Sequence, residues 1–135
     1  MTATVTAYLC AKGASDAIDF YERAFGAKER YRLPNPDGTL GHAEIEIGDT
    51  VLYLSDEAPA LGVFSPSTLK GNSTSFVIDV PDCDAAFQRA VDAGATVERP
   101  MTDQPYGRSG WVVDPFGHRW SIMTGNPDFK PEDMQ

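Results

Sequence analysis

The first half of the chain spaces its apolar residues at two different periods, one typical of a helix and one typical of a strand. After Ser15, a residue type that favours helix N-termini, apolar side chains recur at helical spacing until Gly26. The members of this stripe are Ala17, Ile18, Tyr21, Ala24 and Phe25. Residues 39–48 alternate instead, with Ala43, Ile45 and Ile47 on one face of a predicted strand and His42, Glu44 and Glu46 on the other. Short β-prone runs at residues 5–10, 27–33 and 50–56 complete the order strand, helix and three strands.

The second half of the chain repeats this order. Asp16 corresponds to Asp84, and Gly26 corresponds to Gly94, so the two copies are 68 residues apart. Strand-like runs at residues 73–80, 96–101, 107–114 and 118–124 accompany one helix, which follows Pro81 and Asp82 and ends at Gly94. The apolar stripe of this helix consists of Ala86, Phe87, Ala90 and Val91. Residues 114–117, Asp-Pro-Phe-Gly, have the preferences of a type I turn between the last two strands.

These patterns predict an α+β fold made of two tandem βαβββ modules. We expect the modules at residues 3–56 and 73–124, joined by a linker at residues 57–72 and followed by a polar tail at residues 126–135. A module of this length buries little apolar surface by itself, so both should belong to one domain, residues 1–125. Each helix would cover one face of a curved mixed sheet, and the other faces would enclose a cavity.

Composition and charge narrow the possible partners. The 135 residues include 11 basic and 20 acidic side chains, which gives a net charge of −9. Such a field repels phosphate backbones and anionic lipid surfaces, so we expect no nucleic-acid or membrane partner. The N-terminus lacks the pattern of a secretory signal, and no apolar run is long enough to span a bilayer. Cys10 and Cys83 are too few for a disulfide framework, and a cytoplasmic protein with reduced thiols is the expectation.

Three phrases of the sequence resemble the vicinal oxygen chelate superfamily, which includes glyoxalase I, bleomycin-resistance proteins and extradiol dioxygenases. They are AIDFYERAFGA in the first helix, HAEIEIGDTVLYLSDE across the first hairpin and GWVVDPFGHRWSIMT near the end. The resemblance spans about residues 5–124 and is greatest to the PhnB-like branch. It implies the fold predicted above and a groove between the modules. It also implies a homodimer, because relatives often complete the groove at a subunit contact.

The resemblance further implies where a divalent metal would bind. Enzymes of the superfamily hold a Lewis-acid metal with His or Glu side chains on the first and fourth strands of each module. In this chain those positions are Thr6, Tyr53, Ser75 (or Thr74) and Ser121. Neutral hydroxyls do not hold a divalent ion tightly, so the residues predict no metal and no cofactor.

Several other side chains are candidates for binding a ligand in the cavity. His42 and Glu44 could orient a ligand, move a proton or bind a metal in a different arrangement, or they could form an ordinary solvated strand face. By the repeat, Gly48 corresponds to Gly117, which places Trp111 at the position of His42. Trp111 could stack on an aromatic or cationic ligand, or it could be a core or interface residue.

The remaining candidates lie at the vacated metal positions and in the predicted loop between the strands at residues 96–101 and 107–114. Hydroxyls at Tyr53 and Ser121 would suit hydrogen bonding inside a mostly apolar pocket. Tyr106 and Arg108 belong to a polar hairpin loop at the expected mouth of the cavity, where Arg108 would either clamp an anionic group or lie free on the surface. Two further expectations are structural: Trp120 should face the helix in the core, and His118, just after a tight turn, should have no role in the site.

Three functional hypotheses follow. The first is a metal-free protein that binds a small organic molecule, such as an aromatic natural product or an antibiotic, in a groove lined by His42, Glu44, Tyr53, Trp111 and Ser121. The second is a metal-dependent lyase, isomerase or dioxygenase with an atypical site around His42 and Glu44. The third is a protein whose cavity is vestigial and whose role is association. The sequence therefore leaves open whether the protein is an enzyme.

Overall fold

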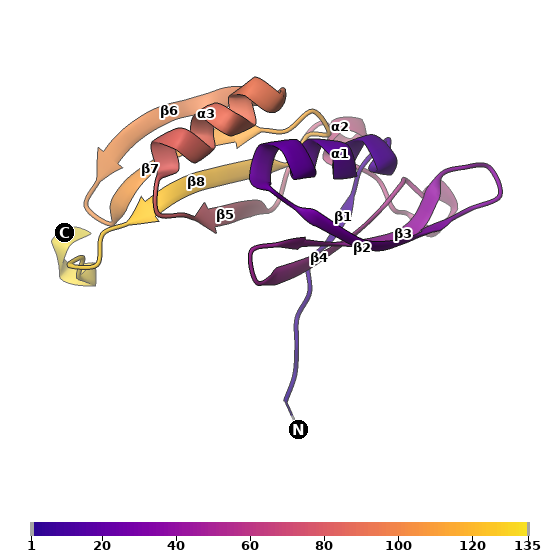
Figure 1. The fold of residues 1–135 in the computed structure, drawn as a ribbon, viewed down its shortest axis with the longest axis horizontal. Helices are drawn as coiled ribbons and strands as arrows, with labels where there is room; N and C mark the ends of the chain where they lie inside the picture. Colours follow the sequence, from indigo (N-terminus) through magenta and orange to yellow (C-terminus); the bar gives the residue numbers. More distant parts are fainter. Residues whose placement is uncertain (1, 135) are drawn as a thin grey trace.

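The computed structural model describes residues 2–134, and it contains the two predicted modules (Figure 1). The first module comprises β1 (Tyr8–Cys10), α1 (Ala14–Phe25), β2 (Lys28–Pro34), β3 (Leu40–Ile47) and β4 (Thr50–Ser55). The second comprises β5 (Ser75–Asp79), α3 (Cys83–Ala93), β6 (Thr96–Gln104), β7 (Gly107–Val113) and β8 (Arg119–Gly125). The chain is therefore an α+β protein with two βαβββ units, as the hydrophobic pattern predicts.

Both sheets have the same strand order and the same mixture of directions. The first sheet runs β1-β4-β3-β2 and the second runs β5-β8-β7-β6. In each sheet the first strand is parallel to its neighbour, and the remaining pairs are antiparallel. Across the parallel pairs Tyr8 lies beside Tyr53, and Val77 lies beside Ser121. The strand β1 is shorter than predicted, so Thr6 precedes it.

The two main helices end as predicted, but only one begins as predicted. Gly26 and Gly94 are the C-caps of α1 and α3, both with positive φ angles that favour glycine. At the N-terminus of α3 the Asp82 carboxylate accepts a hydrogen bond from the Ala85 amide at 3.1 Å. Ser15 does not cap α1. The carboxylate of Asp56, which follows β4, instead accepts from the amides of residues 13 and 14 at 2.9 and 3.0 Å.

The core lies between the helices and the faces of the sheets that they cover. Its largest fully buried side chains are Trp120, Tyr21, Phe20, Ile18, Ile45, Leu54, Ile122 and Val112. Trp120 is 2% exposed, which confirms the prediction that it faces the helix side. The side chains at alternate positions of the same strands project from the opposite faces, which we call the open faces of the two sheets.

Helices α1 and α3 lie side by side, and polar contacts at this seam fix the two modules to one another (Figure 1). The buried carboxylate of Asp114 accepts hydrogen bonds from the Tyr21 hydroxyl at 2.6 Å and from the Trp120 indole N–H at 2.9 Å. The same carboxylate accepts from the amides of residues 116 and 118, and residues 114–117 form the predicted turn. The His118 Nε2 lies 2.8 Å from the Cys10 carbonyl oxygen, so His118 has the structural place expected of it.

The linker and the tail contain short helices that the sequence pattern does not show. The linker includes Pro59–Leu61 and α2 (Pro66–Leu69), and the tail includes Pro131–Met134. The Asn72 amide donates a hydrogen bond to the Gly117 carbonyl at 2.7 Å, which ties the linker to the second module. Among the helices of residues 2–134, none combines the length and the apolar character that a bilayer crossing requires.

Candidate functional site

Four strands bring polar and aromatic side chains together on the open face of the first sheet. His42 and Glu44 are two residues apart on β3, so both project from the same face. Glu44 lies opposite Tyr31 of β2 on one side and Tyr53 of β4 on the other. Tyr8 of β1 lies beside Tyr53. We call these five residues the tyrosine-histidine cluster.

A continuous series of hydrogen bonds connects four of the five residues of the cluster, Tyr8, His42, Glu44 and Tyr31. The Tyr8 hydroxyl lies 2.6 Å from His42 Nδ1, and His42 Nε2 lies 3.0 Å from Glu44 Oε2. The Tyr31 hydroxyl donates to the same Glu44 oxygen at 2.6 Å. The hydrogen bond from Tyr31, and then that from His42, holds the pKa of Glu44 below its usual range. Because an ionised carboxylate only accepts, neutral His42 carries its proton on Nε2 and accepts the Tyr8 hydroxyl proton at Nδ1.

The tyrosine rings surround His42 but leave an accessible outer surface. The His42 ring centroid lies 5.3, 5.9 and 4.9 Å from those of Tyr8, Tyr31 and Tyr53. Tyr8 is 55% exposed and Tyr31 is 44% exposed, whereas Glu44 is only 8% exposed. Partial burial, and then the charge of Glu44, raises the pKa of the Tyr8 hydroxyl, which favours its neutral form. The cluster thus presents tyrosine rings to solvent, above a buried carboxylate.

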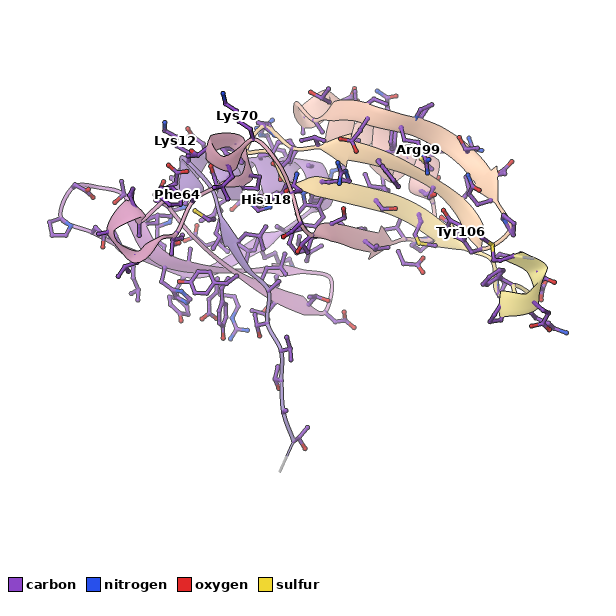
Figure 2. The ribbon with its side chains drawn as sticks, turned by 180° about the vertical axis from the view of Figure 1, so that it is seen from behind. Lys12, Phe64, Lys70, Arg99, Tyr106 and His118 are labelled. Atoms are coloured by element: carbon purple, nitrogen blue, oxygen red, sulfur yellow. The ribbon has the colours of Figure 1, made fainter. Side chains whose placement is uncertain are left out.

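The open face of the second sheet has different chemistry. The guanidinium carbon of Arg99 lies 4.3 Å from the ring centroid of Trp111, and that of Arg119 lies 5.6 Å away. Both distances are within the range of cation–π interactions. Arg119 is also ion-paired with Glu98, and Ser121 lies opposite Trp111 in the register of β7 and β8. Figure 2, which views the molecule from behind, shows Arg99 on this face.

The structure divides the predicted site residues between the two open faces. His42, Glu44 and Tyr53 belong to the first sheet, and Trp111 and Ser121 belong to the second. Among the described residues, no hydrogen bond, ion pair or ring contact links the two groups. The helices pack against one another, and the open faces point away from this seam in residues 2–134 (Figures 1 and 2).

The register also corrects the expected equivalence of Trp111 and His42. The cross-strand partner of Tyr53 is Glu44, and the cross-strand partner of Ser121 is Trp111. Trp111 therefore occupies the position of Glu44, two residues from that of His42. The repeat spacing taken from glycines fails here because the hairpin turns of the two modules differ in length.

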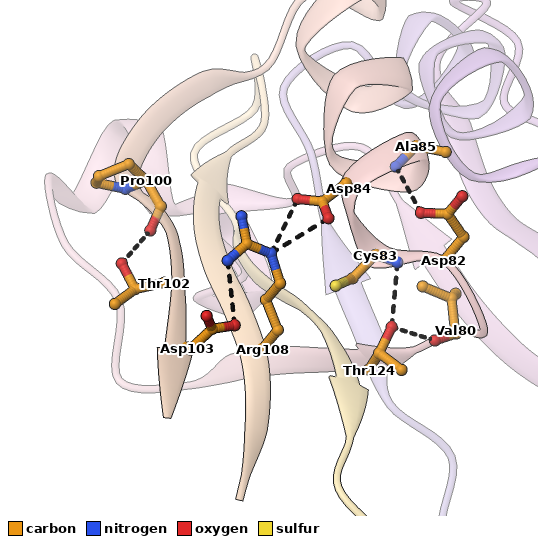
Figure 3. Close-up of polar contacts among 10 residues, drawn as sticks. All are labelled: Val80, Asp82, Cys83, Asp84, Ala85, Pro100, Thr102, Asp103, Arg108 and Thr124. Carbon is orange, nitrogen blue, oxygen red and sulfur yellow. Dashed lines mark hydrogen bonds and ion pairs between the residues drawn. The ribbon is translucent and has the colours of Figure 1, made fainter. Parts of the chain in front are cut away.

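Tyr106 lies in the turn between β6 and β7, within the predicted hairpin loop, whereas Arg108 lies in β7. Arg108 projects toward α3, where its Nε lies 3.1 Å from Asp84 Oδ1 and its Nη1 lies 3.1 Å from Asp103 Oδ1 (Figure 3). The expected place at the mouth of a cavity is wrong, because even-numbered residues of β7 face the helix. The Tyr106 ring packs against Phe129 of the tail, with 6.4 Å between ring centroids.

Sequence reasoning missed Tyr8, Tyr31 and the arginine beside Trp111. Tyr8 is in the predicted first strand with the same parity as Thr6, so it could have been assigned to the open face. Tyr31 and Arg99 lie next to irregularities of the β2–β3 and β6–β7 pairing, and simple alternation does not locate such positions.

Comparison with known proteins gives the family. The model described as the Glyoxalase/Bleomycin resistance protein/Dioxygenase superfamily matches residues 4–122. The chain belongs to this superfamily. An uncharacterized protein of Mycobacterium tuberculosis is 44% identical over 119 residues, which is 85% of this chain and 70% of that protein. The anthracycline biosynthesis protein DnrV of Streptomyces peucetius is 31% identical over 117 residues, which is 85% of this chain and 38% of that protein.

Solved structures of the superfamily have the same fold. The crystal structure of TioX from Micromonospora sp. ML1 has a TM-score of 0.71 and 26% identity, covering 93% of this chain and 100% of that one. The PhnB protein from Bacillus cereus has a TM-score of 0.69 and 18% identity, covering 91% and 100% of the two chains. At 18% identity, the similarity to the PhnB protein concerns the fold alone.

The residues present do not fit the divalent metal of superfamily enzymes. On the open faces, Tyr8 lies beside Tyr53, and Val77 lies beside Ser121. Neither Tyr8 nor Val77 is a usual ligand of a divalent metal. Residues 2–134 contain no group of three or more His, Cys, Asp or Glu side chains arranged to hold an ion. Both ring nitrogens of His42 are already hydrogen-bonded within the cluster.

A large cavity lies elsewhere, between the modules on the helix side. It has a volume of about 730 Å³ and is lined mainly by apolar side chains, among them Phe25, Leu52, Phe76, Ile78, Trp120 and Ile122. None of the residues of the tyrosine-histidine cluster lines this cavity. The open face of the first sheet is the candidate site, because convergent polar groups and exposed aromatic rings occur there together.

Proposed function

We propose that this protein binds a small, flat aromatic molecule on the open faces of its sheets, without the metal of superfamily enzymes, and that it does so as a homodimer. The observation that carries the proposal is the exposed tyrosine-histidine cluster, in which three tyrosines surround a hydrogen-bonded His–Glu pair. Aromatic side chains with a few fixed polar groups are typical of sites for organic ligands.

The aromatic side chains of both faces support a flat ligand. Offset and edge-to-face ring contacts contribute about 0.5–1.5 kcal/mol each beyond the burial of area. Tyr8 and Tyr31 can offer such contacts on the first face, and Trp111 can offer them on the second. A group of exposed aromatic side chains on a strand face is typical of surfaces that bind ligands or other proteins.

The proposed dimer follows from the exposure of these faces. One chain leaves both uncovered, whereas the first sheet of one copy facing the second sheet of another would enclose a site. Charged side chains of both signs lie on each face, with Glu44, Glu46 and Arg30 on the first and Arg99, Arg119 and Glu98 on the second, so a contact between the faces can form ion pairs. A second copy would then bring a Trp111 opposite the cluster.

The named relatives support an aromatic natural product as the ligand class. Two similar proteins, DnrV and DauV, are named for anthracycline biosynthesis, and anthracyclines are polycyclic aromatic compounds. The chain matches 38% and 33% of these two proteins, so their activities do not transfer to it as a whole. The metal-dependent alternative has no comparable support, because the available ligand types and the engaged nitrogens of His42 oppose it.

Tryptophan fluorescence tests the proposal. Trp111 lies on an open face, whereas Trp120 is buried and serves as an internal reference. Titration with a planar hydroxyanthraquinone should quench the Trp111 emission in a saturable way, and Trp111→Phe should remove the quenching but keep the Trp120 emission. Quenching that is unchanged in Trp111→Phe, or a monomer by sedimentation both with and without the compound, would contradict the proposal.

A further inference from the structure

We infer that Tyr8, His42 and Glu44 form a proton relay that takes up the acidic proton of a hydroxyaromatic ligand, so that the ligand is held as its anion. This inference rests on the proposed function, since it specifies the chemical class bound at the same face. It goes beyond that function because it assigns a proton transfer to three named residues.

The geometry of the three side chains is that of a donor, a base and a group that orients the base. The Tyr8 hydroxyl is 2.6 Å from His42 Nδ1, and His42 Nε2 is 3.0 Å from Glu44 Oε2. The two hydrogen bonds use opposite sides of the imidazole ring, so a proton arriving at Nδ1 creates an imidazolium beside the carboxylate. This arrangement is the one that general base catalysis requires of a hydroxyl, an imidazole and an acid.

Neighbouring side chains hold the carboxylate of Glu44 in place. Its Oε2 also accepts the Tyr31 hydroxyl at 2.6 Å, and its Oε1 lies 3.7 Å from Arg30 Nε. Glu44 is 8% exposed, whereas a carboxylate on an ordinary strand face is free to rotate in solvent. Side chains of β1, β2 and β3 therefore fix the orientation of His42. A pair of surface side chains without a function would not require such support.

The outer end of the relay is accessible to a ligand. Tyr8 lies on β1, an edge strand of the first sheet, and is 55% exposed. Its ring contacts those of His42 and Tyr53 at their edges, with centroids 5.3 and 5.6 Å apart. A ligand ring stacked beside these tyrosines would place a hydroxyl substituent near the Tyr8 oxygen.

The proton transfer balances without any other reactant. The ligand O–H bond breaks and its proton passes to the Tyr8 oxygen, while the Tyr8 proton passes to His42 Nδ1. Tyr8 is unchanged at the end, His42 has gained one proton, and the ligand has lost one. The products are a ligand anion and an imidazolium, which remains hydrogen-bonded to the Glu44 carboxylate.

The charges around His42 favour this outcome. The ionisable groups that face it are the hydroxyls of Tyr8, Tyr31 and Tyr53, the carboxylates of Glu44 and Glu46, and the guanidinium of Arg30. The charged group in direct contact with the ring is the Glu44 carboxylate, which lies 3.0 Å from His42 Nε2. An imidazolium is stabilised by an opposite charge within a few ångströms. Among the described residues, the open face of the second sheet has no equivalent of this hydrogen-bonded series. Val77 occupies the position of Tyr8, and no histidine lies on that face.

Two probes of the same shape test the relay. 4-Nitrophenol carries an acidic hydroxyl and absorbs visible light as its anion, whereas 4-nitroanisole has a methyl group in place of that proton. In buffer one pH unit below the pKa of free 4-nitrophenol, binding to the wild-type protein should increase the nitrophenolate band. His42→Ala should abolish the increase and weaken 4-nitrophenol binding about tenfold, the equivalent of one pKa unit, while 4-nitroanisole binding stays within about twofold.

Two further variants serve as a test of the carboxylate and as its control. Glu44→Gln keeps the shape of the side chain but removes the charge, so the nitrophenolate band should fall strongly. Glu22→Gln makes the same chemical change on the exposed surface of α1, away from the relay, and the band should stay at the wild-type level. His42→Gln replaces His42→Ala if circular dichroism shows that the latter is unfolded.

The outcomes separate the relay from the proposed function. If both probes bind the wild-type protein but the nitrophenolate band does not grow, the relay is wrong and aromatic binding stands. The relay is equally wrong if the band persists in folded His42 variants. If neither probe binds, the proposed function itself is contradicted, and the relay with it.

Discussion

The open faces of the two sheets occupy corresponding places in the repeated modules, yet they differ in chemistry. On the first face, Glu44 lies opposite Tyr53 and is hydrogen-bonded to His42. On the second face, Trp111 takes the place of Glu44 and lies against the guanidinium of Arg99. One face thus holds a buried negative charge and a proton donor, and the other holds an aromatic ring with positive charges.

The covered faces of the same strands differ much less. Ile45 and Leu52 form a cross-strand pair on the helix side of the first sheet, and Val112 and Trp120 form the corresponding pair in the second. All four are apolar because each must be buried under a helix. The comparison shows that the packing requirement keeps the repeat visible on the covered faces, whereas the open faces are free to acquire different functions.

The largest expected effect is a loss of stability when the buried carboxylate beside the seam between the two modules is removed. Asp114→Ala removes the acceptor of four hydrogen bonds beside the seam between the modules, three of them buried. Each unsatisfied buried donor costs about 1–3 kcal/mol, so the free energy of unfolding should fall by at least about 3 kcal/mol. Urea denaturation followed by circular dichroism measures the loss.

Asp114→Asn is the matched control for this change. The amide keeps the size of the side chain and one acceptor oxygen, so it should lose less stability than Asp114→Ala. Tyr21→Phe removes only the hydroxyl donor and should lose less still. Equal midpoints for wild type and Asp114→Ala would show that the seam does not depend on this carboxylate.

A smaller effect should distinguish the arginines of the two faces. Arg99→Ala removes a guanidinium that lies 4.3 Å from the Trp111 ring, and cation–π contacts at exposed sites contribute about 0.5–1 kcal/mol. Arg30→Ala removes ion pairs of 3.7 Å with Glu44 and Glu46, whose exposed geometry contributes between about 0 and 1 kcal/mol. We expect the larger decrease in the free energy of unfolding in Arg99→Ala, together with a change in Trp111 fluorescence emission. A larger loss in Arg30→Ala would reverse the comparison.

The smallest effect concerns the acid titration of the first face. Tyr31→Phe removes the main cause of the low pKa of Glu44, so that pKa should rise toward its usual range. A carboxyl with a lowered pKa stabilises the folded state above its unfolded-state pKa, and this contribution is lost as the pH falls through the folded-state value. The variant should therefore lose less stability on acidification than the wild type. Carboxyl-carbon NMR of Glu44 measures the pKa directly, and an unchanged value would contradict the role of Tyr31.

Local sequence patterns were sufficient for most of the elements. Gly26 and Gly94 predicted the helix ends because glycine readily adopts the positive φ that a C-cap needs. The alternation around His42 predicted which side chains of β3 share a face, and Trp120 was assigned to the core from the same argument. These predictions depend only on neighbours along the chain.

Contacts distant in the chain were not predictable in this way. The N-terminus of α1 is capped by Asp56, a residue 42 positions after Ala14, and no local signal marks that role. Arg108 was expected at the mouth of a cavity but pairs with Asp84, because the parity of β7 depends on its pairing with β6 and β8. The turn preferences of residues 114–117 predicted the turn that contains Asp114. They gave no indication that its carboxylate accepts a hydrogen bond from Tyr21 across the seam.

The sequence by itself determined the two modules, the order of helix and strands along the chain, and the covered side of β3 and of Trp120 in β8, because hydrophobic periodicity and glycine placement act over a few residues. Only the tertiary structure decided which polar side chains meet. The hydrogen bonds from Tyr8 to His42 and from Tyr31 to Glu44 depend on the register of neighbouring strands, and register is set by the packing of whole sheets against their helices.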